Sequence, residues 1–230
     1  MQPRAGLAMN ILALEFSSSQ RSVAVVQSDA RRAGLGIAEV IESGGKSGHP
    51  FQMIDECLHQ ARIEREQIDC LAIGLGPGSY HGIRSAISIA QGWSLASVRV
   101  RLLGISTVDC LVRQVQQDGI RGRLNVAIDA QRNEFYLAGY DVRNTDATEL
   151  ESLHLASEVE VQERITAGQP IAGPDLSSRF PKALNLFPRA AALGQLAIGS
   201  TDFISGDKLE PIYLRQTAFV KAPPPKTRFE

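Results

Sequence analysis

The chain has 230 residues, and its 24 lysine and arginine residues nearly balance 25 aspartate and glutamate residues, for a net charge of −1. This balance excludes a protein that binds nucleic acid through a global positive field, because such a field needs clustered excess lysine and arginine. The hydrophobic content of 43% and the charged content of 21% are typical of a globular chain and not of a disordered one.

Cysteine usage and hydropathy indicate a soluble protein from a reducing compartment. Cys57, Cys70 and Cys110 are odd in number and have no C-x-x-C spacing, which predicts free thiols and neither a disulfide framework nor a zinc cluster. The longest uncharged candidate for a membrane span, residues 85–98, is shorter than the roughly 20 residues that a spanning helix needs. We therefore expect a cytoplasmic protein that does not contact a membrane.

The chain opens with three short strand-like segments. Apolar runs at residues 10–15, 22–27 and 36–42 are separated by tight turns, a pattern that predicts an antiparallel meander. Apolar residues at helical spacing then predict a helix from residue 50 to about residue 65. The run at residues 68–74 is typical of a buried strand.

A second helix, at about residues 83–96, follows a glycine-rich loop, and a short strand comes after it. Ser106 or Thr107 can cap the next helix. A hairpin is predicted around residues 130–133, and beyond residue 144 the pattern weakens. The remaining expected elements are a helix at 158–166, a strand ending at residue 173, an alanine-rich helix at 189–198 and an extended proline-rich tail. Such βββαβα units predict an α/β fold in which helices pack against a mixed sheet.

The most distinctive local feature is the glycine-rich segment from Gly74 to Arg84, which follows a strand and opens a helix. Backbone N–H groups and the helix dipole favour an anion at such a position. The segment nevertheless fails both common nucleotide fingerprints, because Ser79 stands where a dinucleotide motif needs glycine and no Gly-Lys-Ser/Thr follows. The alternative is a tight strand-to-helix turn with Ser79 as the N-cap. A second glycine-rich segment, Gly45-Lys46-Ser47, resembles the end of a phosphate-binding loop but lacks its first glycine, and it predicts a solvated loop.

The second helix is rich in small residues between Ser85 and Ala96, and two interpretations remain open. Small side chains let another helix approach closely, so the segment suits tight packing inside its own domain. Small and apolar residues also occur on more than one face, which favours an interface with a partner. Sequence periodicity does not choose between the two.

Two carboxylates end apolar strands and are candidates for chemistry. Glu15 and Asp129 could hold a metal or orient a water molecule, although carboxylates in such positions also commonly cap turns. No two histidines have the i, i+4 spacing of a zincin-type site, and no Gly-x-Ser-x-Gly elbow is present. We therefore predict no metal site and no hydrolytic triad.

Four blocks in order resemble one family. They are residues 10–19, residues 74–84 with Ala90-Gln-Gly92, residues 128–136 and residues 210–215. Together they resemble the TsaB (YeaZ) family, bacterial subunits of the machinery that makes threonylcarbamoyladenosine in tRNA. The resemblance implies an actin/Hsp70/sugar-kinase-like (ribonuclease H-like) fold with an N-terminal lobe at residues 1–106, a C-terminal lobe at 107–215 and a mobile tail at 216–230.

The resemblance also implies a role. The chain would be a non-catalytic scaffold and dimerisation subunit that supports a TsaD-type transferase, because it lacks the histidine pair through which that paralogue binds metal. A TsaE-type ATPase would be a further partner, the chain alone would form a homodimer, and tRNA would be reached only through the complex. No cofactor would be bound by this subunit alone, whereas ATP or ADP would belong to the complex.

The site residues implied by the resemblance fall into two sets. The predicted partner surface lies in the N-terminal lobe and comprises Gly76, Pro77, Gly78, Ser79, Tyr80, Gly82, Arg84, Ile87 and Ala90. Candidates for a residual nucleotide contact are Glu15, Ser17, Asp129 and Arg132.

Departures from the family pattern weaken a claim of nucleotide hydrolysis more than they weaken the fold, and two rival hypotheses stay open beside the scaffold role. Glu15 stands where the family usually has aspartate, Tyr80-His81 replaces Phe-Thr, and Asn133 replaces a glycine. One rival is an actin-like ATPase or small-molecule kinase that uses Asp129, Glu15 and the glycine-rich loop. Another is a metallo-glycoprotease-like protein.

Overall fold

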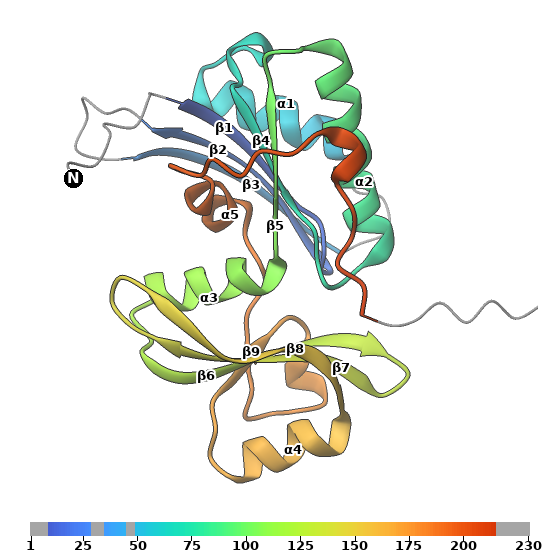
Figure 1. Cartoon of the computed structure of the whole chain (residues 1–230), viewed down its shortest axis with the longest axis vertical. Coiled ribbons are helices and arrows are strands. Elements are labelled where there is room, and N and C mark those ends of the chain that lie inside the picture. Colours follow the sequence, from blue (N-terminus) through green and yellow to red (C-terminus); the bar gives the residue numbers. More distant parts are fainter. Residues whose placement is uncertain (1–8, 29–34, 45–48, 215–230) are drawn as a thin grey trace, which may run out of the picture.

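The computed structural model describes residues 9–28, 35–44 and 49–214. The Gly45-Lys46-Ser47 segment, Arg215 and the predicted tail at residues 216–230 lie outside these ranges. The described residues form two lobes, each built around a five-stranded sheet, one above the other in Figure 1.

The first lobe begins with the predicted antiparallel meander. Its elements are β1 (Met9–Glu15), β2 (Gln20–Ser28), β3 (Leu35–Ser43), α1 (Pro50–Ala61), the short 3-10 helix η1 (Arg65–Gln67), β4 (Cys70–Gly74), α2 (Tyr80–Ala96) and β5 (Arg101–Ile105). The strand order is β3-β2-β1-β4-β5. β1 pairs antiparallel with β2 and parallel with β4, and β4 pairs parallel with β5.

The second lobe repeats this plan with shorter crossovers. Its elements are α3 (Thr107–Gln117), β6 (Gly122–Gln131), β7 (Glu134–Val142), β8 (Ala147–Ser157), α4 (Glu158–Thr166), β9 (Ile171–Gly173), η2 (Leu176–Ser178) and β10 (Leu184–Asn185). Two further elements, α5 (Ala190–Leu196) and η3 (Gly206–Lys208), follow in sequence. The order β10-β9-β6-β7-β8 is the order of the first sheet when the strands are counted from β6. The predicted α/β fold of βββαβα units is confirmed.

Alternation of apolar residues along the strands builds a core on both faces of each sheet. In β1, Leu12 and Leu14 face α1 and α2, whereas Ile11 and Ala13 face α5. One face of the second sheet packs against α3, and its other face packs against α4. The helices α3 and α5 therefore lie between the two sheets (Figure 1).

The end of the described chain returns to the first sheet. Ile204 forms a bridge with Leu102, and the N–H of Ile212 donates to the carbonyl oxygen of Leu75 at 2.8 Å. The segment from α5 onward thus packs on the first sheet in space, although in sequence it falls within the predicted C-terminal lobe. No helix among the described residues is long and apolar enough to cross a membrane.

Candidate functional site

The glycine-rich segment forms the predicted strand-to-helix turn between β4 and α2. Ser79 is the N-cap of α2, and its hydroxyl oxygen accepts a hydrogen bond from the N–H of Gly82 at 3.4 Å. The N–H of Ser79 itself donates to the carbonyl oxygen of Ser17 at 2.6 Å. The chain's own groups therefore engage two of the donors that a phosphate would use at a helix N-terminus.

Close approach to the β1–β2 turn explains the glycines of this segment. A Cβ atom on Gly78 would lie 2.2 Å from the carbonyl oxygen of Ser17, and one on Gly82 would lie 1.9 Å from that of Phe16. A Cβ on Gly74 would lie 2.2 Å from Oε2 of Glu15. The glycines let backbone pack against backbone, so their spacing reflects tight packing of the first lobe.

Glu15 is fully buried beneath this turn. Its Oε1 accepts a hydrogen bond from the N–H of Ser17 at 2.8 Å, and its Oε2 accepts one from the hydroxyl of Thr107 at 3.2 Å. Burial raises the pKa of this carboxyl, while the hydrogen bonds from Ser17 and Thr107 oppose that rise. Both oxygens are therefore hydrogen-bonded to groups inside the protein, and Ser17, which is 3% exposed, is buried with them.

Asp129 and Arg132 occupy the corresponding turn of the second lobe and are exposed. Oδ1 of Asp129 accepts a hydrogen bond from the N–H of Gln131 at 2.7 Å, so this carboxylate caps a turn. Gln131, Arg132 and Asn133 have φ angles of 63°, 57° and 61°. Positive φ at the two central residues is what a type I′ two-residue hairpin requires, and asparagine tolerates this conformation better than most residues.

The residues predicted to form a partner surface divide between the core and the surface. Ser79, Tyr80 and Arg84 are exposed and Gly78 is half-buried, whereas Gly76, Pro77, Gly82, Ile87 and Ala90 are buried. Ile87 is 5% exposed and Ala90 is fully enclosed, both within the cluster between α2 and the first sheet. We therefore correct the prediction for these two side chains, because they pack inside their own lobe and a charge at Ile87 would destabilise the fold before it disturbed an interface.

The outer face of α2 is the surface that a partner can reach. We define this α2 face as Tyr80, Arg84, Ser88, Gly92 and Leu95, which recur at helical spacing and are exposed. Leu95 is 87% exposed, and a Cβ on Gly92 would meet nothing within 4 Å. Tyr80 and Arg84 were named from the sequence, and Ser88 and Gly92 are among the small residues for which an interface was one of two interpretations. Leu95 was not predicted, although its spacing from these residues was a signal for it.

Aromatic and basic groups order the N-terminal end of the α2 face. Nη1 of Arg84 donates to the hydroxyl of Tyr80 at 2.8 Å, and its guanidinium lies 5.4 Å from the centre of that ring. Tyr213, from the end of the described chain, meets Tyr80 edge to face with 6.3 Å between ring centres.

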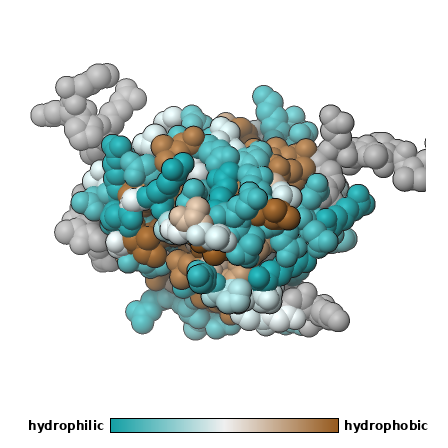
Figure 2. Space-filling view, turned by 90° about the horizontal axis from the view of Figure 1, so that it is seen from below, coloured by the Kyte–Doolittle hydropathy of each residue, from teal (hydrophilic) through white to brown (hydrophobic). Residues whose placement is uncertain are grey.

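The face of the molecule at the α4 end has a different character. Seen from that end, apolar residues occur in separate patches among hydrophilic ones (Figure 2).

The three cysteines are free and buried, as predicted. Burial raises the pKa of Cys57 to about 11 and that of Cys70 to about 12, and it raises the pKa of Cys110 well above the ordinary value. Protonated, enclosed thiols are poor nucleophiles and poor metal ligands, so they serve the core.

Comparison with known proteins gives a consistent set of relatives. Residues 47–193, more than half of the chain, match the family model described as TsaD: tRNA N6-adenosine threonylcarbamoyltransferase. The tRNA threonylcarbamoyladenosine biosynthesis protein TsaB of Escherichia coli (strain K12) is 29% identical over 195 residues, which cover 76% of this chain and 82% of the relative. The TsaB protein of Buchnera aphidicola subsp. Schizaphis graminum is 30% identical over 138 residues, covering 59% of this chain and 62% of the relative.

A solved structure shares the fold. YeaZ from Pseudomonas aeruginosa superposes with a TM-score of 0.73 at 24% identity, covering 90% of this chain and 100% of that chain. This likeness shows that the two chains share a fold, with the two five-stranded mixed sheets described above, and it agrees with the α/β fold that the sequence predicted.

Proposed function

The chain belongs to the family of the tRNA N6-adenosine threonylcarbamoyltransferase TsaD and, within it, to the TsaB (YeaZ) group, and on this premise we propose that it is a non-catalytic scaffold subunit in the biosynthesis of threonylcarbamoyladenosine in tRNA. A TsaD-type subunit carries out the chemistry, and this chain binds it through the α2 face. The relatives from Escherichia coli and Buchnera aphidicola carry the name of this biosynthesis.

The enclosure of Glu15 is the observation that carries the non-catalytic assignment. A carboxylate that orients a water molecule or a metal must present an oxygen to the site, yet both oxygens of Glu15 accept hydrogen bonds from Ser17 and Thr107 at zero exposure. The neighbouring helix N-terminus is capped by Ser79 and by the Ser17 carbonyl. The glycine-rich turn and the N-terminus of α2, which resemble a phosphate site, are thus used for contacts within the first lobe.

The shape of the α2 face supports its role in binding. Gly92 and Ser88 lie on the same side of α2 and leave room for a partner helix to approach closely, and Leu95 offers an apolar contact beside them. No described residue needs Gly92 to be glycine, because a Cβ atom there would meet none of them within 4 Å. A glycine in a helix interior costs about 0.5–1 kcal/mol relative to alanine, so a partner that approaches there accounts for it.

The proposal extends to the composition of the complex. The same face serves a homodimer when the chain is alone and the TsaD-type subunit when that is present, so the two assemblies exclude each other. A TsaE-type ATPase joins the complex, ATP or ADP belongs to that assembly, and tRNA is reached through it. The net charge of −1 fits a subunit that does not hold tRNA by itself. The proposed compartment is the cytoplasm.

Association with a cognate TsaD-type subunit tests the proposal. Wild-type chain should form a defined complex in size-exclusion chromatography with light scattering. Gly92→Arg should weaken that complex by at least about tenfold, because a long cation on the α2 face would be desolvated in the contact.

A matched control places the same charge elsewhere. Gln162→Arg puts an arginine on the exposed face of α4 and should bind as wild type does. No complex with the wild-type chain under any nucleotide condition would contradict the scaffold role. Equal binding of both arginine variants would contradict the assignment of the α2 face.

The rival ATPase draws its support from the exposed carboxylate of Asp129 at the end of β6. We expect the purified chain alone to release no phosphate from ATP above the level of Asp129→Ala. Turnover by the wild type that disappears in Asp129→Ala would favour the rival.

A further inference from the structure

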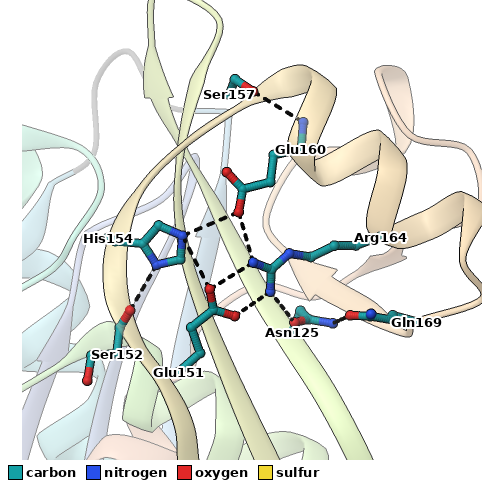
Figure 3. Close-up of polar contacts among 8 residues, drawn as sticks. All are labelled: Asn125, Glu151, Ser152, His154, Ser157, Glu160, Arg164 and Gln169. Atoms are coloured by element: carbon teal, nitrogen blue, oxygen red, sulfur yellow. Dashed lines mark hydrogen bonds and ion pairs between the residues drawn. The ribbon is translucent and has the colours of Figure 1, made fainter.

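A histidine and two glutamates come together where β8 meets α4 (Figure 3). This part of the second lobe is remote from α2 in the first lobe (Figure 1). Glu151 and His154 belong to β8, and Glu160 lies in the first turn of α4. Nε2 of His154 is 3.6 Å from Oε1 of Glu151 and 3.5 Å from Oε1 of Glu160. The three side chains are 35–38% exposed, so an ion from solvent can reach them.

The other ring nitrogen fixes the tautomer of His154. Nδ1 lies 2.9 Å from the carbonyl oxygen of Ser152, which can only accept, so Nδ1 carries the hydrogen and donates it. In the neutral ring Nε2 then bears a lone pair, and Figure 3 shows it directed at the two carboxylate oxygens. Three acceptors thus face one another, and a cation beside them would be attracted to all three. An imidazole whose Nδ1–H is anchored on a carbonyl, with Nε2 free, is the arrangement found in metal-ligating histidines.

Arg164 holds the two carboxylates in place. Its Nη1 and Nη2 bind Oε2 and Oε1 of Glu151 at 2.5 and 2.8 Å, and Nη2 also binds Oε1 of Glu160 at 2.8 Å. Nη1 donates as well to Oδ1 of Asn125, which is 1% exposed. These contacts fix the positions of both carboxylates. One cation against two carboxylates leaves a net negative charge, and each carboxylate oxygen that accepts from Arg164 keeps a second lone pair.

We propose that Glu151, His154 and Glu160 bind a divalent transition-metal ion of the zinc class, with Arg164 as the residue that orients both carboxylates. Two ligands about 2.0–2.1 Å from a tetrahedral zinc ion lie about 3.3–3.4 Å apart, close to the two distances from Nε2 of His154. An imidazole with two carboxylates suits zinc, cobalt or nickel better than magnesium or calcium. Water completes the coordination. A bound ion would join β8 to α4 and add to the hold that Arg164 already provides.

Metal titration of the purified full chain tests this site. After treatment with a chelator, wild-type chain should bind one zinc ion per molecule in isothermal titration calorimetry, and cobalt should give a visible absorption spectrum of a four-coordinate ion. His154→Gln should weaken zinc binding at least about tenfold and abolish the cobalt spectrum, because it removes the nitrogen ligand and leaves the Arg164 contacts intact.

Histidines elsewhere on the surface provide the controls. His59→Gln and His81→Gln change exposed residues outside the cluster and should bind zinc as wild type does. Should His154→Gln fail to fold, Glu160→Gln replaces it as the test, and it should likewise weaken zinc binding and change the cobalt spectrum. No bound zinc in the wild type would overturn the proposal. Equal zinc affinity in wild type and His154→Gln would overturn it as well. Both readouts use the chain alone, so they do not depend on the proposed partner.

Discussion

The two lobes have the same strand order and differ in the helix that comes after their fourth strand. In the first lobe β4 leads through the glycine-rich turn into the 17-residue helix α2, whereas in the second lobe β9 leads into the three-residue 3-10 helix η2. Both crossovers begin with Gly-Pro, at Gly76-Pro77 and Gly173-Pro174. The difference shows that only the first lobe has a long crossover helix with a free outer face.

The first hairpin turns of the two lobes differ as well. Long-range contacts hold the β1–β2 turn, where Glu15 is buried under Thr107 and the glycine-rich segment. Its counterpart in the second lobe is exposed. That turn is formed by residues with left-handed backbone and by the hydrogen bond that the side chain of Asp129 accepts from Gln131. The two lobes thus share a strand order, but the first hairpin turn is enclosed in the first lobe, beneath the proposed binding helix, and exposed in the second. Substitutions in the two turns and in α2 test that contrast, from the largest expected effect to the smallest.

Gly82→Ala should be the most damaging of these changes. The new Cβ would lie 1.9 Å from the carbonyl oxygen of Phe16, so α2 or the β1–β2 turn must move, at a cost of about 3 kcal/mol in the free energy of unfolding. Gly92→Ala, on the outer face of the same helix, should instead stabilise the chain by about 0.5–1 kcal/mol. Urea unfolding measures both, and similar losses in the two variants would show that α2 does not pack closely on the β1–β2 turn.

Glu15→Gln should stabilise the chain at neutral pH. Burial raises the pKa of Glu15 in the folded state above its ordinary value of 4.5, so the folded chain holds this proton to higher pH than the unfolded chain does. The stability that the wild type draws from this group is complete below pH 4.5 and is lost as the pH rises through the folded pKa. The advantage of glutamine should therefore grow above pH 4.5 and then level off.

Unfolding free energies of wild type and Glu15→Gln across this pH range give the measurement. Asp129→Asn at pH 7 is the matched change in the other turn, and it should alter stability by less than about 0.5 kcal/mol because the side chain is exposed. A variant Glu15→Gln that is less stable than wild type at pH 7 would contradict the buried environment of Glu15.

Arg132→Gly should stabilise the open turn. A non-glycine residue in the left-handed region costs about 1 kcal/mol, and glycine at φ 57° removes that cost although it gains freedom in the unfolded chain. We expect a net gain of about 0.5 kcal/mol, detected as a higher melting temperature. A clear loss of stability would mean that the Arg132 side chain makes a contact that the turn needs.

Ser19→Ala should have the smallest effect. The hydroxyl of Ser19 donates to Oδ2 of Asp175 at 2.7 Å and links the β1–β2 turn to the loop after β9. Exposed hydrogen bonds of this kind contribute at most about 1 kcal/mol, so stability should fall by less than that. Faster amide hydrogen exchange in the two loops of Ser19→Ala would show that this hydrogen bond stabilises them. An unchanged exchange pattern would show that it does not.

Much of this architecture was predictable from the sequence, because local patterns determined it. The meander, the Ser79 cap and the helix at 158–166 follow from alternation, turn residues and capping chemistry. The strand β8 was missed because it is an edge strand with mostly exposed residues, among them Glu149 and Leu150, so its apolar alternation is weak.

The site was harder to predict, because its properties depend on residues that are distant in sequence. Thr107, 92 residues from Glu15, is what completes the enclosure of that carboxylate. Periodicity identified α2 but not which of its sides faces its own lobe, and the resemblance that placed Ile87 on the partner surface gave no sign that this side chain is buried. The cluster at His154 has no spacing signature in the sequence, because a single histidine and two glutamates from β8 and α4 come together only in the fold.

Reconstituted threonylcarbamoyl transfer to tRNA tests the central claim most directly. A cognate TsaD-type subunit with the remaining components should modify tRNA when wild-type chain or Gln162→Arg is added, and should lose most of that activity without the chain or with Gly92→Arg. Full activity in the absence of the chain, or with Gly92→Arg at stoichiometric concentration, would contradict a scaffold that acts through the outer face of α2.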